Sequence, residues 1–191
     1  MRNTFDRFNG RHQDYQAARP SYAQEFLDWL GELYAPPERY TAADIGSGTG
    51  KLSAQLLAAG FRVCGVEPNP DMRGAAEALL GGDPRFSSSN GTDHDTGLPD
   101  RSVDMVAAAQ AFHWFDGPAF ARECRRILRP GGRAVLVWNV RGSAPMNQAL
   151  AQVFREHCPS FHGFTGGMGR TTPASGIFSA GRMKSGGSPI P

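Results

Sequence analysis

The hydrophobic positions of the chain follow two repeating patterns up to about residue 160. Short runs of apolar residues predict strands, since a strand covered on both faces carries apolar side chains on both. These runs span residues 40–45, 61–66, 103–109 and 134–138. A weaker strand is expected at 85–89, which is polar apart from Phe86. Elsewhere, apolar residues recur at three- and four-residue spacing, which predicts helices at 21–34, 51–59, 70–80, 118–128 and 145–157.

Residues that begin and end helices stand at the borders of these segments. Ser21 and Gln24 have the spacing of a capping box, Pro70 occupies a first helical turn, and Asp116 can cap the helix after it. The run Pro-Gly-Gly at 130–132 is expected to separate that helix from the fifth strand.

Strands that alternate with helices indicate βαβ units with right-handed crossovers and a parallel sheet. We therefore expect an α/β fold: a doubly wound, mainly parallel sheet with helices on both faces. Residues 1–40 form an N-terminal helical segment, and residues 41–162 form the main domain. Residues 163–191 hold many glycines, serines and prolines without an apolar repeat, so we expect a disordered tail there.

Composition and charge exclude several classes of protein. The chain has 191 residues and a net charge of +2, and its basic excess lies in the tail, which argues against a nucleic-acid binder. No apolar run approaches the length of about 18 residues that a membrane span needs. The three cysteines are far apart and form neither a disulfide framework nor a zinc motif. Since no secretory leader is visible either, we expect a cytoplasmic protein.

The most informative stretch is a glycine-rich loop between the first strand and the next helix, residues 43–52. Backbone amides at such a helix start can hold an anionic or polar ligand. A Walker phosphate loop is excluded, because only three residues separate Gly46 from Gly50 and Leu52 follows Lys51. A dinucleotide fingerprint would need glycine or alanine where Lys51 stands.

The remaining pattern, D-x-G-x-G-x-G, resembles class I S-adenosylmethionine-dependent methyltransferases, which have a Rossmann-like fold. The N-terminal segment, residues 15–22, resembles the small-molecule branch related to trans-aconitate and quinone-type methyltransferases. The resemblance covers roughly residues 5–160. It rests on motifs in the family's order, at residues 44–50, 66–69, 91–94, 98–104, 110–115 and 128–133.

The resemblance implies roles for the residues around the loop. Gly46, Ser47 and Gly48 would underlie the methionine part of the cofactor, and Asp44 would orient the loop or meet the cofactor's amino group. Glu67 would accept hydrogen bonds from both ribose hydroxyls, a geometry suited to a carboxylate.

Three further residues are implied to contact the cofactor. Asp93 and His94 fall where the family contacts the adenine edge, although many relatives have Ala-Glu there. Gln110 would lie beneath the cofactor, at the carboxyl end of the fourth strand.

The other candidate site residues each have two interpretations. His113 could act as a base or position a substrate, or it could pack with its aromatic neighbours. Tyr15 and Arg19 could contact the cofactor carboxylate or an acidic substrate, or belong to a frayed N-terminus. Four arginines at 122, 125, 126 and 129 could meet an acidic partner, or form a solvated face. We expect no metal site.

The function expected is methyl transfer from S-adenosylmethionine to a small organic acceptor, with no nucleic-acid or membrane partner. Two alternatives remain: an inactive cofactor-binding remnant or interaction module, and a nicotinamide-dependent oxidoreductase. The family normally adds an antiparallel hairpin after the fifth strand, and no candidate for it is visible here. We therefore expect a C-terminally truncated domain, whose exposed fifth strand favours self-association.

Overall fold

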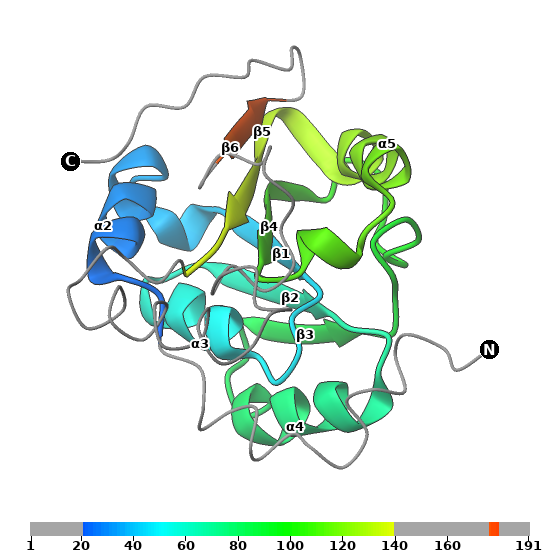
Figure 1. Ribbon diagram of the computed structural model, residues 1–191. Coiled ribbons are helices and arrows are strands. Elements are labelled where there is room, and N and C mark those ends of the chain that lie inside the picture. Colours follow the sequence, from blue (N-terminus) through cyan, green and yellow to red (C-terminus); the bar gives the residue numbers. More distant parts are fainter. Residues whose placement is uncertain (1–20, 140–175, 180–191) are drawn as a thin grey trace, which may run out of the picture.

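The structure, a computed structural model, describes residues 21–139 and 176–179 (Figure 1). Its helices are α2 (Gln24–Leu33), α3 (Lys51–Ala58), α4 (Pro70–Leu80) and α5 (Gly117–Ile127), with short 3-10 turns η2 (Pro37–Arg39) and η3 (Phe112–Trp114). Its strands are β1 (Thr41–Ile45), β2 (Arg62–Val66), β3 (Phe86–Ser89), β4 (Val103–Ala109), β5 (Leu128–Val137) and β6 (Gly176–Ser179).

These strands form one sheet in the order β3-β2-β1-β4-β5-β6. The strands from β1 to β5 are parallel, and β6 runs antiparallel to β5. The order reverses between β1 and β4, because β2 and β3 extend the sheet on one side and β4 and β5 on the other. Sheets of this type bind ligands at such a reversal, at the carboxyl ends of the central strands.

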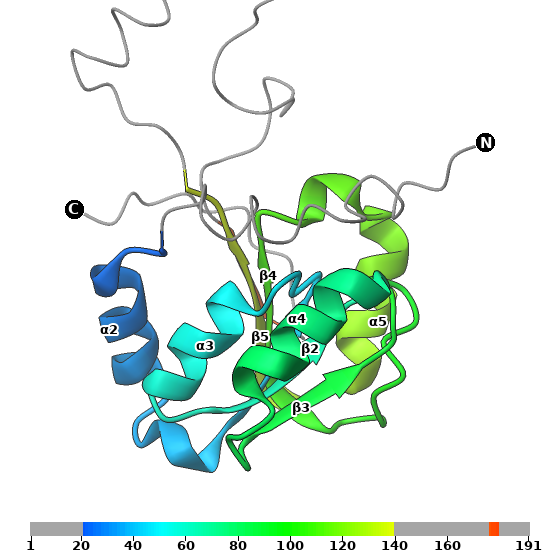
Figure 2. The same cartoon turned by 90° about the horizontal axis from the view of Figure 1, so that it is seen from below.

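Alternate residues of the central strands face two separate hydrophobic cores. Ala42, Met105 and Val135 pack against α2 and α3, whereas Ala43, Val106 and Leu136 pack against α5. Figure 2 shows α2, α3 and α4 along one face of the sheet, with α5 on the other. The doubly wound α/β fold expected from the sequence is therefore confirmed.

Most element borders agree with the sequence pattern, and two differ. The predicted capping box is wrong, because α2 begins at Gln24 after Ala23 and has no side-chain cap. Strand β5 begins at Leu128 rather than at 134. Its register jumps from Val103↔Leu128 to Met105↔Arg133, so the Pro-Gly-Gly segment bulges within the strand instead of separating it from α5.

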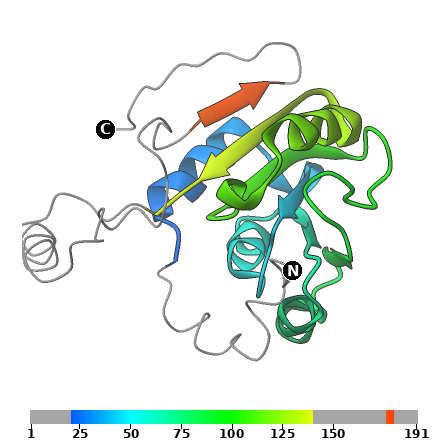
Figure 3. The ribbon, with the colours of Figure 1, turned by 45° about the vertical axis from the view of Figure 1, so that its right-hand side comes forward.

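The expectation that the fifth strand has an unpaired edge is wrong. Four residues of β5, from Arg133 to Leu136, pair with β6 (Figure 3). The expectation of a disordered tail is therefore wrong at residues 176–179, which form strand β6. The predicted helix at 145–157 lies outside the described residues.

The amino ends of three strands are joined by one carboxylate. The Asp104 Oδ2 atom accepts hydrogen bonds from the Thr41 backbone amide at 2.8 Å and from Arg129 Nη1 at 2.6 Å. These residues lie near the starts of β4, β1 and β5. This junction therefore fixes the edge of the sheet that is opposite the carboxyl ends of the strands.

Asp104→Ala should lower the free energy of unfolding by about 1–3 kcal/mol, because the Thr41 amide loses its acceptor in a half-buried position. Arg129→Ala should cost less than about 1 kcal/mol, because an ion pair whose arginine is 44% exposed contributes little. Urea denaturation of both variants in one buffer checks this difference. Equal losses would show that the bond to Thr41 contributes nothing extra.

Candidate functional site

The glycine loop after β1 is fastened to the end of β2. The amides of Gly46 and Ser47 both donate to the Val66 carbonyl oxygen, at 2.8 and 3.2 Å, and the Gly50 amide donates to the Ser47 carbonyl oxygen at 3.0 Å. Gly65 leaves room for this arrangement, because a Cβ atom there would lie 3.0 Å from Ser47 Oγ. The loop is thus held at the carboxyl ends of both strands.

Gly46 and Gly48 have left-handed backbone conformations, with φ of 71° and 57°, and they differ in their surroundings. A Cβ atom on Gly46 would lie 2.8 Å from the Ala111 Cβ atom. A Cβ atom on Gly48 would meet nothing within 4 Å. Gly46 is therefore required by packing, whereas Gly48 borders open space that a ligand can approach.

Asp44 is the last polar residue of β1 and is 1% exposed. Its Oδ2 atom accepts a hydrogen bond from Ser53 Oγ at 2.7 Å, while its buried Oδ1 atom has no hydrogen-bond partner among the described residues. Burial raises the pKa of this carboxyl to about 6, partly opposed by the bonds from Ser53, and the nearby Glu67 carboxylate raises it further. An unpartnered buried acceptor of this kind fits a cationic donor.

Glu67 follows β2 and has both carboxylate oxygens bonded to backbone amides. Oε2 accepts from the Gly48 amide and Oε1 from the Asn69 amide, each at 2.9 Å. Its side chain is buried, which raises the pKa of the carboxyl, although these two bonds oppose the shift. Since a carboxylate oxygen has two lone pairs, each can still accept from a ligand hydroxyl.

Asn69 is a residue of the site that our sequence prediction missed. Its Oδ1 atom caps α4 by accepting from the amides of Asp71 and Met72, both at 3.0 Å. Arg73 Nη1 donates to the Glu67 carbonyl oxygen at 2.8 Å and so holds the same turn. An asparagine before Pro70 is a usual helix start, so this signal was present in the sequence.

Asp93 and His94 lie in the segment after β3. The Asp93 Oδ2 atom accepts from the Asp116 backbone amide at 3.0 Å, and its Oδ1 atom lies 3.1 Å from His94 Nδ1. His94 is exposed. Asp93 therefore links this segment to the start of α5, a contact that the sequence did not indicate.

The segment after β4 bears Gln110 and His113. Gln110 has φ of 56°, which is rare for a residue with a side chain, and its Nε2 atom donates to the Asn139 carbonyl oxygen at 3.2 Å. Backbone strain of this kind often marks functional sites. The exposed His113 ring lies beside Trp114, with 4.8 Å between ring centroids, and Trp114 is 50% exposed.

The predicted residues fall into two groups at the carboxyl edge of the sheet. At the ends of β1 and β2, a hydrogen bond joins Glu67 to the Gly46–Gly48 loop, and Asp44 precedes this loop and bonds Ser53 of α3. The segments after β3 and β4 supply the rest. Tyr15 and Arg19 lie outside the described residues.

Residues 21–139 and 176–179 also bear on other kinds of site. No three histidine, cysteine, aspartate or glutamate side chains gather there in a way that could hold a metal ion. Within the same ranges, no helix has the length and apolar character needed to cross a membrane.

The strand order and the glycine loop at its reversal define a Rossmann-like cofactor-binding domain. Residues 43–136 match the sequence profile of a family described as "Methyltransferase domain". This part of the chain therefore belongs to the methyltransferase family.

Relatives in distant organisms agree with this assignment. An uncharacterized methyltransferase of Mycobacterium tuberculosis is 42% identical over 127 residues, which are 66% of this chain and 49% of that protein. An uncharacterized methyltransferase-like protein of Schizosaccharomyces pombe is 32% identical over 153 residues, 78% of this chain and 59% of that one. The chain spans about half the length of the curated relatives it matches.

Solved structures share the fold. A protein of Anaeromyxobacter dehalogenans, provisionally assigned as a type II methyltransferase, aligns with a TM-score of 0.60 and 37% identity, over 73% of this chain and 56% of that one. A protein of Anabaena variabilis is provisionally assigned as a methyltransferase of antibiotic biosynthesis. It aligns with a TM-score of 0.56 and 26% identity, over 73% of this chain and 56% of that one.

The two loop glycines should differ in their tolerance of alanine. Gly48→Ala should lower the free energy of unfolding by about 1–2 kcal/mol, the cost of a left-handed backbone with a side chain. Gly46→Ala should cost roughly 1–3 kcal/mol more, because its methyl group also overlaps Ala111. Denaturant unfolding measures both changes. If Gly46→Ala cost no more than Gly48→Ala, the close approach to Ala111 would be wrong.

The burial of Asp44 should make stability fall as pH rises. Its folded pKa of about 6 lies above the ordinary value of 3.8, so the folded state binds the proton more tightly between these values. The unfolding free energy of Asp44→Asn minus that of the wild type should grow by roughly 2–3 kcal/mol between pH 4 and pH 7. A pH-independent difference would contradict the raised pKa.

Proposed function

We propose that this protein transfers a methyl group from S-adenosylmethionine to a small organic acceptor. The observation that carries the proposal is the placement of two buried carboxylates around an open glycine loop. Asp44 offers an unbonded oxygen on one side, and Glu67 holds the Gly48 amide on the other. Family membership of residues 43–136 supports the same activity.

The described residues fit the parts of this cofactor. The Asp44 Oδ1 atom would accept from its amino group, because a buried acceptor gains most from a charged donor. Glu67 would accept from the ribose hydroxyls with its remaining lone pairs. Asp93 would accept from the adenine amine, with His94 at the rim. Gln110, at the carboxyl end of β4, would lie beneath the cofactor.

The bound cofactor supplies the methyl group on a sulfonium centre that is open to displacement. The protein's own contribution is then to bind, to orient and to exclude water, which can account for a large share of the rate enhancement. His113 would hold or accept the acceptor's proton when the acceptor is a hydroxyl or an amine. Carboxylate acceptors would need no such base.

We propose a small molecule rather than a nucleic acid or a membrane as the partner. The near-neutral charge of the chain supports this choice, since nucleic-acid binding requires an excess of basic residues on one face. A cytoplasmic location stays a prediction. Self-association through an exposed β5 edge loses its basis, because β6 pairs with that edge.

Calorimetric titration with S-adenosylhomocysteine, NADH and ATP tests the choice of cofactor. S-adenosylhomocysteine should bind more tightly than the other two, and methyl transfer to small carboxylates and phenols should then be measurable. Tighter binding of NADH or ATP would refute the proposal. Binding without any transfer would favour an inactive cofactor-binding domain.

Glu67→Ala should weaken S-adenosylhomocysteine binding by about 30- to 1000-fold, since a charged acceptor of two hydroxyl bonds contributes roughly 2–4 kcal/mol. The matched control is Glu77→Ala on α4, an acid that is half exposed and paired only loosely with Arg73 at 3.8 Å. It should change the dissociation constant less than about twofold. Equal effects of the two substitutions would remove Glu67 from the binding site.

A further inference from the structure

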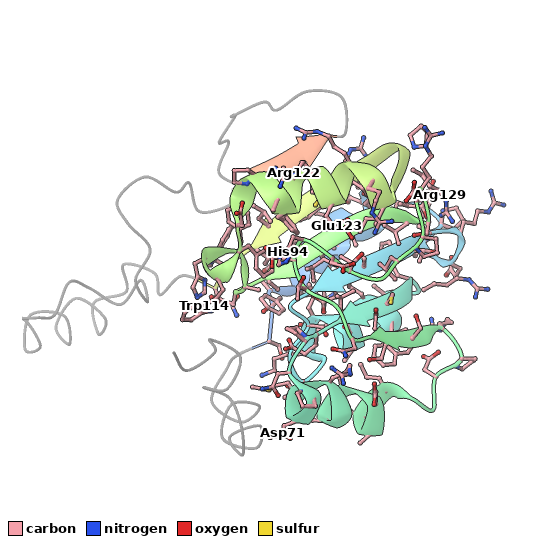
Figure 4. The ribbon with its side chains drawn as sticks, turned by 90° about the vertical axis from the view of Figure 1, so that its right-hand side faces the viewer. Asp71, His94, Trp114, Arg122, Glu123 and Arg129 are labelled. Carbon is pink, nitrogen blue, oxygen red and sulfur yellow. The ribbon has the colours of Figure 1, made fainter. Side chains whose placement is uncertain are left out.

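A buried carboxylate on α5 is not explained by the proposed chemistry. Glu123 is 6% exposed, and Figure 4 shows it on the side of the helix that faces the rest of the domain, whereas Arg122 lies on the outer side. The other buried residues of α5 are Phe120, Cys124 and Ile127, which pack in the core. A charged residue beside them requires specific partners.

Those partners come from the segment that follows β3 and from the next turn of α5. The Glu123 Oε1 atom accepts from the Thr96 backbone amide at 2.9 Å and from Thr96 Oγ1 at 2.6 Å. Arg126 donates to both oxygens of Glu123, at 2.7 and 2.8 Å, and to Asp100 Oδ1 at 2.7 Å. The carboxylate therefore remains charged, and these bonds lower its pKa to about 2 in spite of burial.

Thr96 is the centre of this segment and is 1% exposed. Its Oγ1 atom accepts from the Leu98 amide at 3.2 Å, and its carbonyl oxygen accepts from Ser89 Oγ at 2.8 Å. Gly91 lies so close that a Cβ atom there would be 2.5 Å from the Thr96 carbonyl oxygen. The segment is thus folded around Thr96, and Glu123 holds Thr96 to α5.

The same segment is attached to α5 at a second point. Asp93 accepts from the amide of Asp116, the residue that caps α5 through its own bond to the Ala119 amide. Two attachments along one helix fix both the position and the direction of the chain between them. A buried ion pair contributes little net stability compared with apolar residues, so its value here is the geometry that it imposes.

We infer that Glu123 is a positioning residue for the adenine subsite: it holds Thr96 so that Asp93 is presented to the adenine amine. This inference rests on the proposed function, because it needs an adenosyl ligand. It adds a residue that does not touch the cofactor. This residue determines how well the protein distinguishes ligands that differ at one position of the base.

The test compares two ligands that differ at that position. S-adenosylhomocysteine carries an amine on the base, and S-inosylhomocysteine carries an oxygen. A bond from this amine to a charged acceptor should let the wild type prefer the adenosyl ligand by about tenfold or more. Glu123→Ala should reduce this preference to about threefold or less, because the segment loses its anchor.

Two milder variants keep the test decisive if Glu123→Ala fails to fold. Thr96→Val removes the hydroxyl bond and preserves the shape, so the preference should fall at least threefold. Glu123→Gln keeps an acceptor for Thr96 and should retain most of the preference. Ile127→Val, a core substitution on the same helix, should lose stability and leave the preference unchanged.

Hydrogen exchange in the free protein separates the two possible failures. Glu123→Ala should speed exchange of the Thr96 amide about tenfold relative to Ile127→Val. If the wild type binds neither ligand but exchange responds in this way, the proposed function fails and the anchoring stands. If S-adenosylhomocysteine binds and Glu123→Ala and Thr96→Val keep the full preference, the inference is overturned and the function stands.

Discussion

The hydrogen bond from the Gly48 amide to the Glu67 carboxylate joins the two strands on which the whole site depends. Besides this bond, the Val66 carbonyl oxygen holds the glycine loop after β1 to β2. The second oxygen of Glu67 bonds the Asn69 amide, and Asn69 caps α4. One carboxylate therefore sets the loop conformation, the turn after β2 and the start of a helix, before any ligand is considered.

Asp44 and Glu123 show two solutions for a buried carboxylate. Asp44 has one partner for two oxygens, and burial raises its pKa. Glu123 has an arginine and a threonine, and its pKa falls. The first arrangement reduces the stability of the folded state at neutral pH and leaves an acceptor available. In the second arrangement the carboxylate receives its hydrogen bonds from the protein itself. Its role is therefore to hold other groups of the protein in place.

Much of the fold could be predicted from the sequence because its strands are apolar runs and its helices are amphipathic. The borders of β4 agree to the residue, and Pro70 and Asp116 mark helix starts correctly. Two features escaped prediction for a shared reason. The Pro-Gly-Gly bulge and the pairing of β6 depend on partner strands, and a pattern in one segment does not show which segment will lie beside it.

The residues of the site also divide into those that could be predicted from the sequence and those that could not. The glycine loop, Asp44 and Glu67 are adjacent in a known motif order, so their grouping followed from the sequence. The bonds from Thr96 to Glu123 and from Asp116 to Asp93 join residues that are 27 and 23 positions apart. No local pattern links these positions, because their proximity depends on how α5 packs against the sheet.

The position of β1 in the middle of the sheet has a consequence for synthesis on the ribosome. Its neighbour on one side, β2, follows soon after it in the chain, but its other neighbour, β4, comes after two helices and a third strand. Gly46 also rests against Ala111, which is made later still. A nascent chain that ends before residue 103 therefore has a glycine loop with one wall absent, and the loop acquires its final support only when β4 and the turn after it have emerged.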